Sequence, residues 1–268
     1  MSEFAGIGVA QFVPGTDRDS NLATMLGLAA EAAGRGATLV VFPEYSLYFS
    51  AEMGAAAVAA AEPLDGPFVA GIAEIASEVG IHIVAGTLEQ TTDASRFSNT
   101  LVAVSPAGDL LATYRKMHLY DAFGHMESDF VVAGDILEPE TFSWGGFTVG
   151  LQTCYDIRFP EVTRRLVDAG ADLVLVPSEW VRGPLKESHW RTLMTARAIE
   201  NTIYIAAADH APPIGVGNSM VVDPMGVELV TIGEITDVAV AMISPTRIAE
   251  VRKINPALTL RRFTVAPR

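Results

Sequence analysis

Two parts of the sequence occur twice in the same order, and this internal repetition limits the folds that the chain can adopt. Residues 36–43 resemble residues 170–177, and each run follows a predicted helix. Residues 98–102 resemble residues 217–221, and a turn containing Pro-x-Gly follows both. A duplicated unit of helices and strands buries its two sheets face to face, with the helices outside. We therefore predict an α/β fold, a four-layer α-β-β-α sandwich with an internal pseudo-twofold repeat.

The spacing of apolar residues and the positions of Gly and Pro divide the chain into elements. The predicted elements are strands at 4–12, 38–42, 81–88, 99–105, 110–115 and 147–152, helices at 21–35 and 67–79, and a hairpin turn at 145–146. Because the chain has no linker rich in Ser or Pro, we predict a single domain over residues 1–268. Residues 248–268 show little core-forming pattern and are expected to form a tail at a subunit contact.

Composition excludes several classes of protein. The formal net charge is −14, which disfavours nucleic acid and anionic membranes as partners. The longest apolar runs are far shorter than the roughly 20 residues that span a bilayer, and the N-terminus lacks the pattern of a signal peptide. The single cysteine, Cys154, cannot form an internal disulfide. We therefore predict a cytoplasmic protein.

Three ionisable residues come directly after predicted strands, where α/β sheets gather their ligands. Glu44 follows the strand at 38–42, Lys116 follows the strand at 110–115, and Cys154 lies between a strand and a helix that Pro160 can open. A thiol facing a helix N-terminus is more easily ionised, because the free N–H groups there favour negative charge. Each residue alone also fits a structural role: a helix cap, a solvated lysine or a small buried thiol.

Taken together, the three segments resemble the signature segments of the nitrilase, or carbon-nitrogen hydrolase, superfamily. Residues 196–201 (ARAIEN) and 217–226 (GNSMVVDPMG) are also similar to that family. The resemblance covers nearly the whole chain and implies a catalytic triad of Glu44, Lys116 and Cys154. It also implies that Glu127 is a second glutamate of the site. Within the superfamily, the sequence resembles the ω-amidase and deaminated-glutathione amidase branch most. The loop between Lys116 and Glu127 is shorter than that branch usually has, so the pocket entrance is expected to differ.

The implied chemistry is amide hydrolysis through a covalent thioester. Cys154 would be the nucleophile, and Glu44 the general base that later protonates the leaving ammonia. Lys116 and the backbone N–H of Tyr155 would stabilise the oxyanion. Glu127 would hold Lys116, and two carboxylates around one lysine are expected to have different pKa values.

Residues of the substrate pocket follow from proximity to these segments. Four aromatic residues are expected either in an aromatic wall of the pocket or in the core: Tyr45, Tyr48, Tyr120 and Trp180. Tyr155 is also expected to bind the substrate. Glu179 is expected to repel a substrate carboxylate.

The sequence allows two roles for Arg158. The resemblance to N-carbamoyl amino acid hydrolases implies that it clamps a substrate carboxylate. Its structural alternative is an ion pair with Glu161 or Asp156. No metal or other cofactor is implied, because none of the five histidines has the spacing of a metal site.

The sequence therefore favours an enzyme that hydrolyses a small amide to a carboxylic acid and ammonia. Three alternatives stay open: an N-carbamoyl amino acid or amine hydrolase, a non-catalytic binding or scaffold protein on the same fold, and a redox sensor that uses Cys154. The resemblance also favours a homodimer, in which the subunits pack through residues 159–166.

Overall fold

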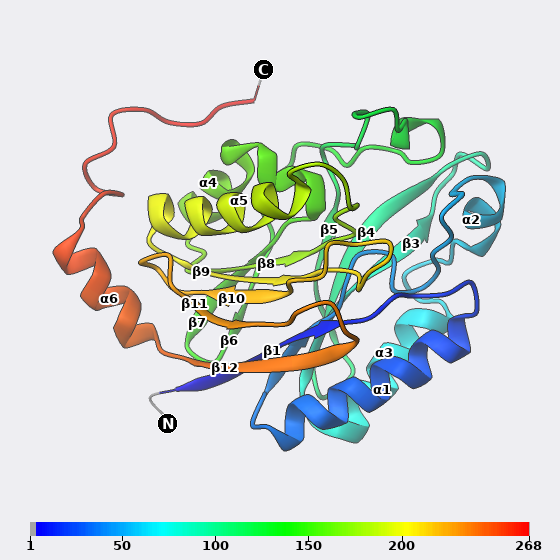
Figure 1. The fold of residues 1–268 in the computed structure, drawn as a ribbon, viewed down its shortest axis with the longest axis horizontal. Coiled ribbons are helices and arrows are strands. Elements are labelled where there is room, and N and C mark those ends of the chain that lie inside the picture. The colour runs from blue at the N-terminus through cyan, green and yellow to red at the C-terminus, as the bar shows by residue number, and fades with distance from the viewer. Residues whose placement is uncertain (1–3, 268) are drawn as a thin grey trace.

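The structure is a computed structural model that describes residues 4–267, and its strands form two mixed six-stranded sheets (Figure 1). The first sheet has the order β12 (Asp237–Ile243), β1 (Ala5–Gln11), β2 (Leu39–Val41), β3 (His82–Gln90), β4 (Phe97–Val104), β5 (Leu110–Arg115). The second has the order β11 (Glu228–Thr231), β10 (Met220–Val222), β9 (Tyr204–Ala208), β8 (Leu173–Pro177), β7 (Phe147–Leu151), β6 (Thr141–Trp144).

The two sheets repeat one pairing pattern, as the sequence predicts. In the first sheet β1, β2 and β3 are parallel neighbours, and β4 and β5 continue antiparallel. In the second sheet β7, β8 and β9 are parallel, and β10 and β11 continue antiparallel. The remaining strands, β12 and β6, pair antiparallel with β1 and β7. The similar runs at 36–43 and 170–177 therefore form equivalent strands, β2 and β8.

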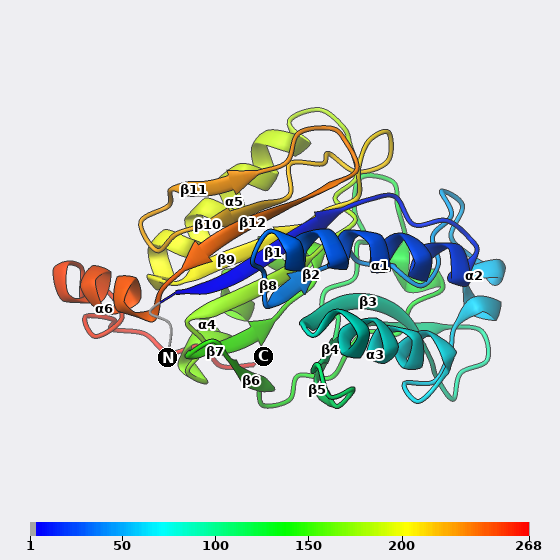
Figure 2. The same cartoon turned by 90° about the horizontal axis from the view of Figure 1, so that it is seen from below.

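Four layers result, with helices on the outer side of each sheet (Figure 1), and Figure 2 shows the same elements from below. Helices α1 (Arg18–Gly34) and α3 (Pro67–Val79) pack on the first sheet, and α4 (Pro160–Asp168) and α5 (Lys186–Asn201) pack on the second. Between the sheets lies a separate apolar cluster that includes Ile7, Leu39, Leu151 and Leu175. Strands β1 and β8 are covered on both faces and are fully buried, and every residue in them except Gln11 is apolar. The α-β-β-α prediction is confirmed.

Two helices differ from the prediction. Helix α1 begins at Arg18, three residues before the predicted start, because the Asp17 carboxylate caps it by accepting the N–H of Ser20 at 2.8 Å. Helix α2 (Ala55–Ala60) was not predicted, because its alanine-rich sequence has no amphipathic period.

The C-terminal segment is the main correction. It contains helix α6 (Pro245–Ile254), capped by the Ser244 hydroxyl, with Ile248 buried between the sheets. The part of residues 248–268 that continues α6 is therefore core-forming. Beyond it, Arg261 forms an ion pair with Asp168 of α4 in the same chain. Within residues 4–267, no helix is long and apolar enough to cross a bilayer.

Candidate active site

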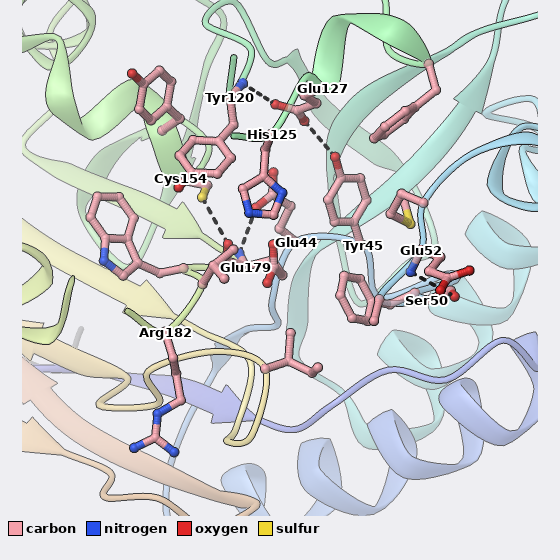
Figure 3. A pocket seen from close by; sticks show the side chains of 18 of the residues that line it. Glu44, Tyr45, Ser50, Glu52, Tyr120, His125, Glu127, Cys154, Glu179 and Arg182 are labelled. Carbon is pink, nitrogen blue, oxygen red and sulfur yellow. Dashed lines mark hydrogen bonds between the residues drawn. The ribbon is translucent and has the colours of Figure 1, made fainter. Parts of the chain in front are cut away.

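The sheet ends bring the four predicted catalytic residues to one cavity of about 360 Å³. Glu44 follows β2, Lys116 follows β5 directly, Cys154 follows β7, and Glu127 begins the short 3-10 helix η1 (Glu127–Asp129). In Figure 3 the side chains of Glu44, Glu127 and Cys154 surround this cavity. All four residues are at least nine-tenths buried. Residues that are far apart in the sequence thus share one cavity.

Lys116 is held between two carboxylates. Its Nζ lies 2.9 Å from Glu44 Oε1, and 3.0 and 2.9 Å from the two carboxylate oxygens of Glu127. Burial alone would lower the pKa of Lys116, but the charges of Glu127 and Glu44 outweigh it and raise the pKa well above its usual value. The lysine is therefore a fixed cation.

The two carboxylates have pKa values shifted in opposite directions. Burial raises the pKa of Glu44, and the charge of Glu127 adds to the rise, against the opposing effect of Lys116. Burial also acts to raise the pKa of Glu127, but Lys116 and hydrogen bonds from Tyr45 and Tyr120 outweigh it, so that this pKa is lowered. Glu127 is thus a permanent anion, and Glu44 is the group able to exchange a proton.

Asn99 is a site residue that the sequence did not reveal. Its amide nitrogen lies 2.6 Å from Glu44 Oε1 and 3.1 Å from Glu127 Oε1, so it donates to both carboxylates. It lies within β4, a strand in which every residue is buried. A polar amide in a fully buried strand needs a hydrogen-bond partner. An asparagine within a predicted buried strand was therefore the sequence feature that could have identified Asn99 as a site residue.

Cys154 occupies a strained turn. It is the first residue of the 3-10 helix η2 (Cys154–Arg158). Its φ is 43°, in the left-handed region of the backbone that residues other than glycine rarely adopt. Its thiol donates to the carbonyl oxygen of Glu179 at 3.5 Å. Burial, followed by the charge of Glu44, raises the pKa of this thiol well above its usual value. The predicted easy ionisation is therefore wrong for the resting site, and α4 begins only at Pro160.

Asp156 connects the nucleophile turn to the lysine segment, and it too was missed as a site residue. Its fully buried carboxylate accepts the N–H of Thr153 at 3.2 Å and the hydroxyl of Tyr114 at 2.7 Å. It also accepts the backbone N–H of His118 at 3.0 Å. Tyr114 and His118 flank Lys116, so one carboxylate fixes the positions of both segments.

Gly86 of β3 permits the close approach behind Glu44. A Cβ at this position would lie 2.7 Å from the Glu44 Cα, closer than real Cβ atoms come to backbone atoms. The N–H of Gly86 donates to the carbonyl of Pro43 at 3.1 Å. Only glycine leaves room for the backbone of β3 to approach the Glu44 Cα this closely. Gly86 therefore helps to set how far Glu44 extends into the cavity.

Five of the seven predicted pocket residues line the cavity: Tyr45, Tyr120, Tyr155, Glu179 and Trp180. Tyr48 does not line it. The structure places Tyr48 in the apolar core on the helix-covered face of the first sheet, so the core alternative applies to it.

Arg158 does not line the cavity either. Its guanidinium lies 4.8 Å from the ring of Trp180 and 3.3 Å from Nδ1 of His189. Among the described residues it has no ion pair, and the carboxylate of Asp156 is occupied by other donors. The predicted ion pair with Glu161 or Asp156 is therefore not formed among the described residues, and the clamp on a substrate carboxylate stays a prediction.

Glu179 joins the site through its backbone as well as its side chain. Its N–H donates to Glu44 Oε2 at 2.7 Å and its carbonyl accepts from Cys154. Burial and the nearby charge of Glu44 raise the pKa of the Glu179 carboxyl well above its usual range. A raised pKa favours the protonated carboxyl, and protonation would weaken the expected repulsion of a substrate carboxylate. That repulsion stays a prediction.

The cavity wall includes residues that were not predicted, notably His125 and Lys186. Among residues 4–267, no group of three or more His, Cys, Asp or Glu side chains has the arrangement of a metal site.

Comparison with known proteins identifies the family to which the chain belongs. The model of the carbon-nitrogen hydrolase family matches residues 6–253. A Mycobacterium tuberculosis protein described as a hydrolase is 40% identical over 262 residues, which cover 92% of this chain and 91% of that protein. The deaminated glutathione amidase of Escherichia coli O157:H7 is 36% identical over 257 residues, which cover 96% of this chain and 97% of that enzyme.

A solved structure is also similar. It is a variant of the amidase from Nesterenkonia sp. AN1 in which acrylamide has added to the active-site cysteine. The TM-score is 0.77 at 28% identity, and the match covers 96% of this chain and all of that chain. Because the family model spans most of the sequence and both relatives match over nearly their full length, the chain belongs to the carbon-nitrogen hydrolase family.

Proposed function

We propose that the protein is an amidase that hydrolyses a small amide to a carboxylic acid and ammonia through a thioester on Cys154. The observation that carries the proposal is the Lys116 ammonium, which is fixed between two carboxylates beside a buried thiol. The names of the similar Escherichia coli and Nesterenkonia enzymes support amide chemistry. A cavity of about 360 Å³ suits a small substrate.

Attack on the amide begins with proton transfer. Because burial keeps the resting thiol protonated, Cys154 loses its proton to Glu44 as sulfur bonds to the amide carbon. The raised pKa of Glu44 makes it a stronger base than a solvent-exposed glutamate. It also makes Glu44 able to give the same proton to the amide nitrogen when the C–N bond breaks.

The negative charge on the substrate oxygen is stabilised by Lys116 and by the backbone N–H of Tyr155. Donors of this kind contribute about 3 kcal/mol each when they are held in place before the reaction. Glu127 holds Lys116 throughout, since its lowered pKa keeps it charged. After ammonia leaves, Glu44 takes a proton from water, the water attacks the thioester, and the acid product leaves with Cys154 protonated again.

An ammonia-release screen tests the function. The panel contains ω-amides such as glutaramate, simple aliphatic amides, carbamoyl amino acids and nitriles. We expect release from at least one amide by the wild-type protein and none by Cys154→Ala. Ammonia with carbon dioxide from a carbamoyl substrate alone would replace the proposal with an N-carbamoyl hydrolase. Release by Cys154→Ala at the wild-type rate would refute the thiol mechanism.

We propose in addition that residues 1–268 form one domain that works as a homodimer in the cytoplasm, with residues 248–268 near the subunit contact. The reducing cytoplasm suits a catalytic thiol. The predicted contact segment is residues 159–166, and its apolar residues Val162 and Leu166 are buried within the chain itself. The exposed apolar residues next to α5 offer another surface: Ile199, Met225, Val227 and Leu229. Light scattering at micromolar concentration should give twice the chain mass, and a monomer mass would refute the dimer.

A further inference from the structure

Lys186 is a buried cation in the cavity wall that the proposed mechanism does not use. It is the first residue of α5 and is 6% exposed. Its Nζ lies over three aromatic rings, 4.7 Å from Tyr120, 4.8 Å from Phe123 and 4.9 Å from Trp180. Among the described residues, no carboxylate oxygen lies within 4 Å of this ammonium. A buried charge without a counter-ion is costly, so its presence needs an explanation.

A second cation that has no ion pair within residues 4–267 lies close to Lys186. The guanidinium of Arg158 packs on the same rings, 4.8 Å from Trp180 and 5.8 Å from Phe123. Burial first, and then the charge of Arg158, act to lower the pKa of Lys186. The N-terminus of α5 adds positive potential at the same place. An anion beside Lys186 would relieve this repulsion.

Tyr120 completes a pair of donors. Lys186 Nζ donates to its hydroxyl oxygen at 2.9 Å, and within the part of the chain that the structure describes that hydroxyl proton has no acceptor. The pKa of Tyr120 is raised to about 12, mainly by burial, so the hydroxyl stays protonated. The pair therefore presents an O–H and two further N–H donors, which match the two oxygens of a carboxylate.

We propose that Lys186, together with the Tyr120 hydroxyl, binds a carboxylate at the far end of the amide and so selects anionic over neutral substrates. Lys186 is then a specificity-determining residue, a role that rests on the proposed amidase function. Glu179 lines the same cavity, and burial raises the pKa of its carboxyl, which weakens the repulsion that an entering anion meets. A merely structural lysine, held by its aromatic neighbours, would not affect the choice of substrate.

The test compares two amides of equal chain length, glutaramate, which ends in a carboxylate, and valeramide, which ends in a methyl group. We expect Lys186→Met to lower the ratio of their kcat/KM values at least fiftyfold, mainly through the KM for glutaramate. Lys186→Arg, which keeps the charge, should retain most of the ratio. Lys253→Met is the matched control, because Lys253 is exposed on α6, away from the cavity. An unchanged ratio in Lys186→Met would overturn the proposal.

A second readout separates this proposal from the amidase function. Glutarate should slow iodoacetamide labelling of Cys154 in the wild-type protein and in Lys253→Met but not in Lys186→Met, and this needs no turnover. Protection that depends on Lys186, without cleavage of any amide, would uphold the anion site and refute the amidase. Amide cleavage with neither this protection nor the charge preference would do the reverse. Melting temperatures show whether each variant is folded.

Discussion

The substitution Glu127→Gln separates a positioning role of this residue from a structural one. The Glu127 carboxylate accepts from Tyr45 at 2.6 Å, from Asn99 at 3.1 Å and from Lys116 through both oxygens. Glutamine keeps the shape and one acceptor oxygen, but it removes the charge and gives one oxygen position to an NH₂ group that cannot accept. Of the two carboxylates that contact Lys116, Glu44 then remains.

The expected loss follows from the role of Lys116. If the ammonium shifts from the position of the oxyanion, the reaction loses one preorganised donor, which contributes about 3 kcal/mol. At about 1.36 kcal/mol per tenfold change, this loss is about a hundredfold in kcat.

The pH dependence changes as well. The charge of Glu127 helps to raise the pKa of Glu44, so its removal lowers that pKa. A general base acts when deprotonated, and the rising limb of the pH–rate profile should therefore move to lower pH.

The assay uses amidase rate, its pH profile, melting temperature and iodoacetamide labelling of Cys154 on one preparation. The matched control is Asp129→Asn, which removes the same charge from an exposed position in the same short helix. We expect the control to keep the wild-type rate and profile. A wild-type rate in Glu127→Gln with a lowered melting temperature would refute the reasoning and assign Glu127 to structure alone.

Three further predictions concern neighbouring groups. Since the pKa of the Cys154 thiol is raised well above 9, its iodoacetamide labelling should accelerate up to pH 9 and beyond, and an inflection below pH 8 would contradict its burial in the thiol form. Asp156→Asn should lower kcat at least tenfold with a KM within about threefold, because the segments of Cys154 and Lys116 lose their common anchor; an unchanged kcat with a lowered melting temperature would make Asp156 structural. The folded-state pKa of Glu179 is raised, so the unfolded chain binds fewer protons above the unfolded pKa of about 4.3 and stability falls as pH rises. The melting temperature of Glu179→Gln relative to wild type should therefore increase from pH 5 to pH 8, and a constant difference would show that the carboxyl is ionised in the fold.

Local patterns predict most of the fold. Helix α3 begins at Pro67 and ends at Val79 as predicted, because proline at its first position and Gly80 after its end fix both limits. The start of α1 and the whole of α6 depend instead on hydrogen-bonding caps and on contacts with the opposite sheet. An apolar period does not encode such contacts.

The positions of Glu44, Lys116 and Cys154 after strands are visible in the sequence, but their electrostatics are not. The thiol pKa depends on burial and on the charge of Glu44, which the fold brings from another sheet. The roles of Asn99 and Asp156 likewise arise from partners far along the chain. In the sequence, nothing distinguishes Lys186 from an ordinary lysine at the start of a helix. Only the structure shows that it is buried in the cavity wall.

The central claim is that amide hydrolysis passes through a thioester on Cys154, and detection of that covalent intermediate tests it most directly. The reaction with an amide found by the screen is quenched in acid during steady-state turnover, and the protein is analysed by intact mass and peptide mapping. Hydroxylamine is then added to turnover of that amide and of the ester of the same acid. We predict an acyl group on the peptide that contains Cys154, and one ratio of hydroxamate to acid from both substrates, because both pass through the same thioester. Turnover with no acyl group on Cys154, and a ratio that changes with the leaving group, would contradict the mechanism.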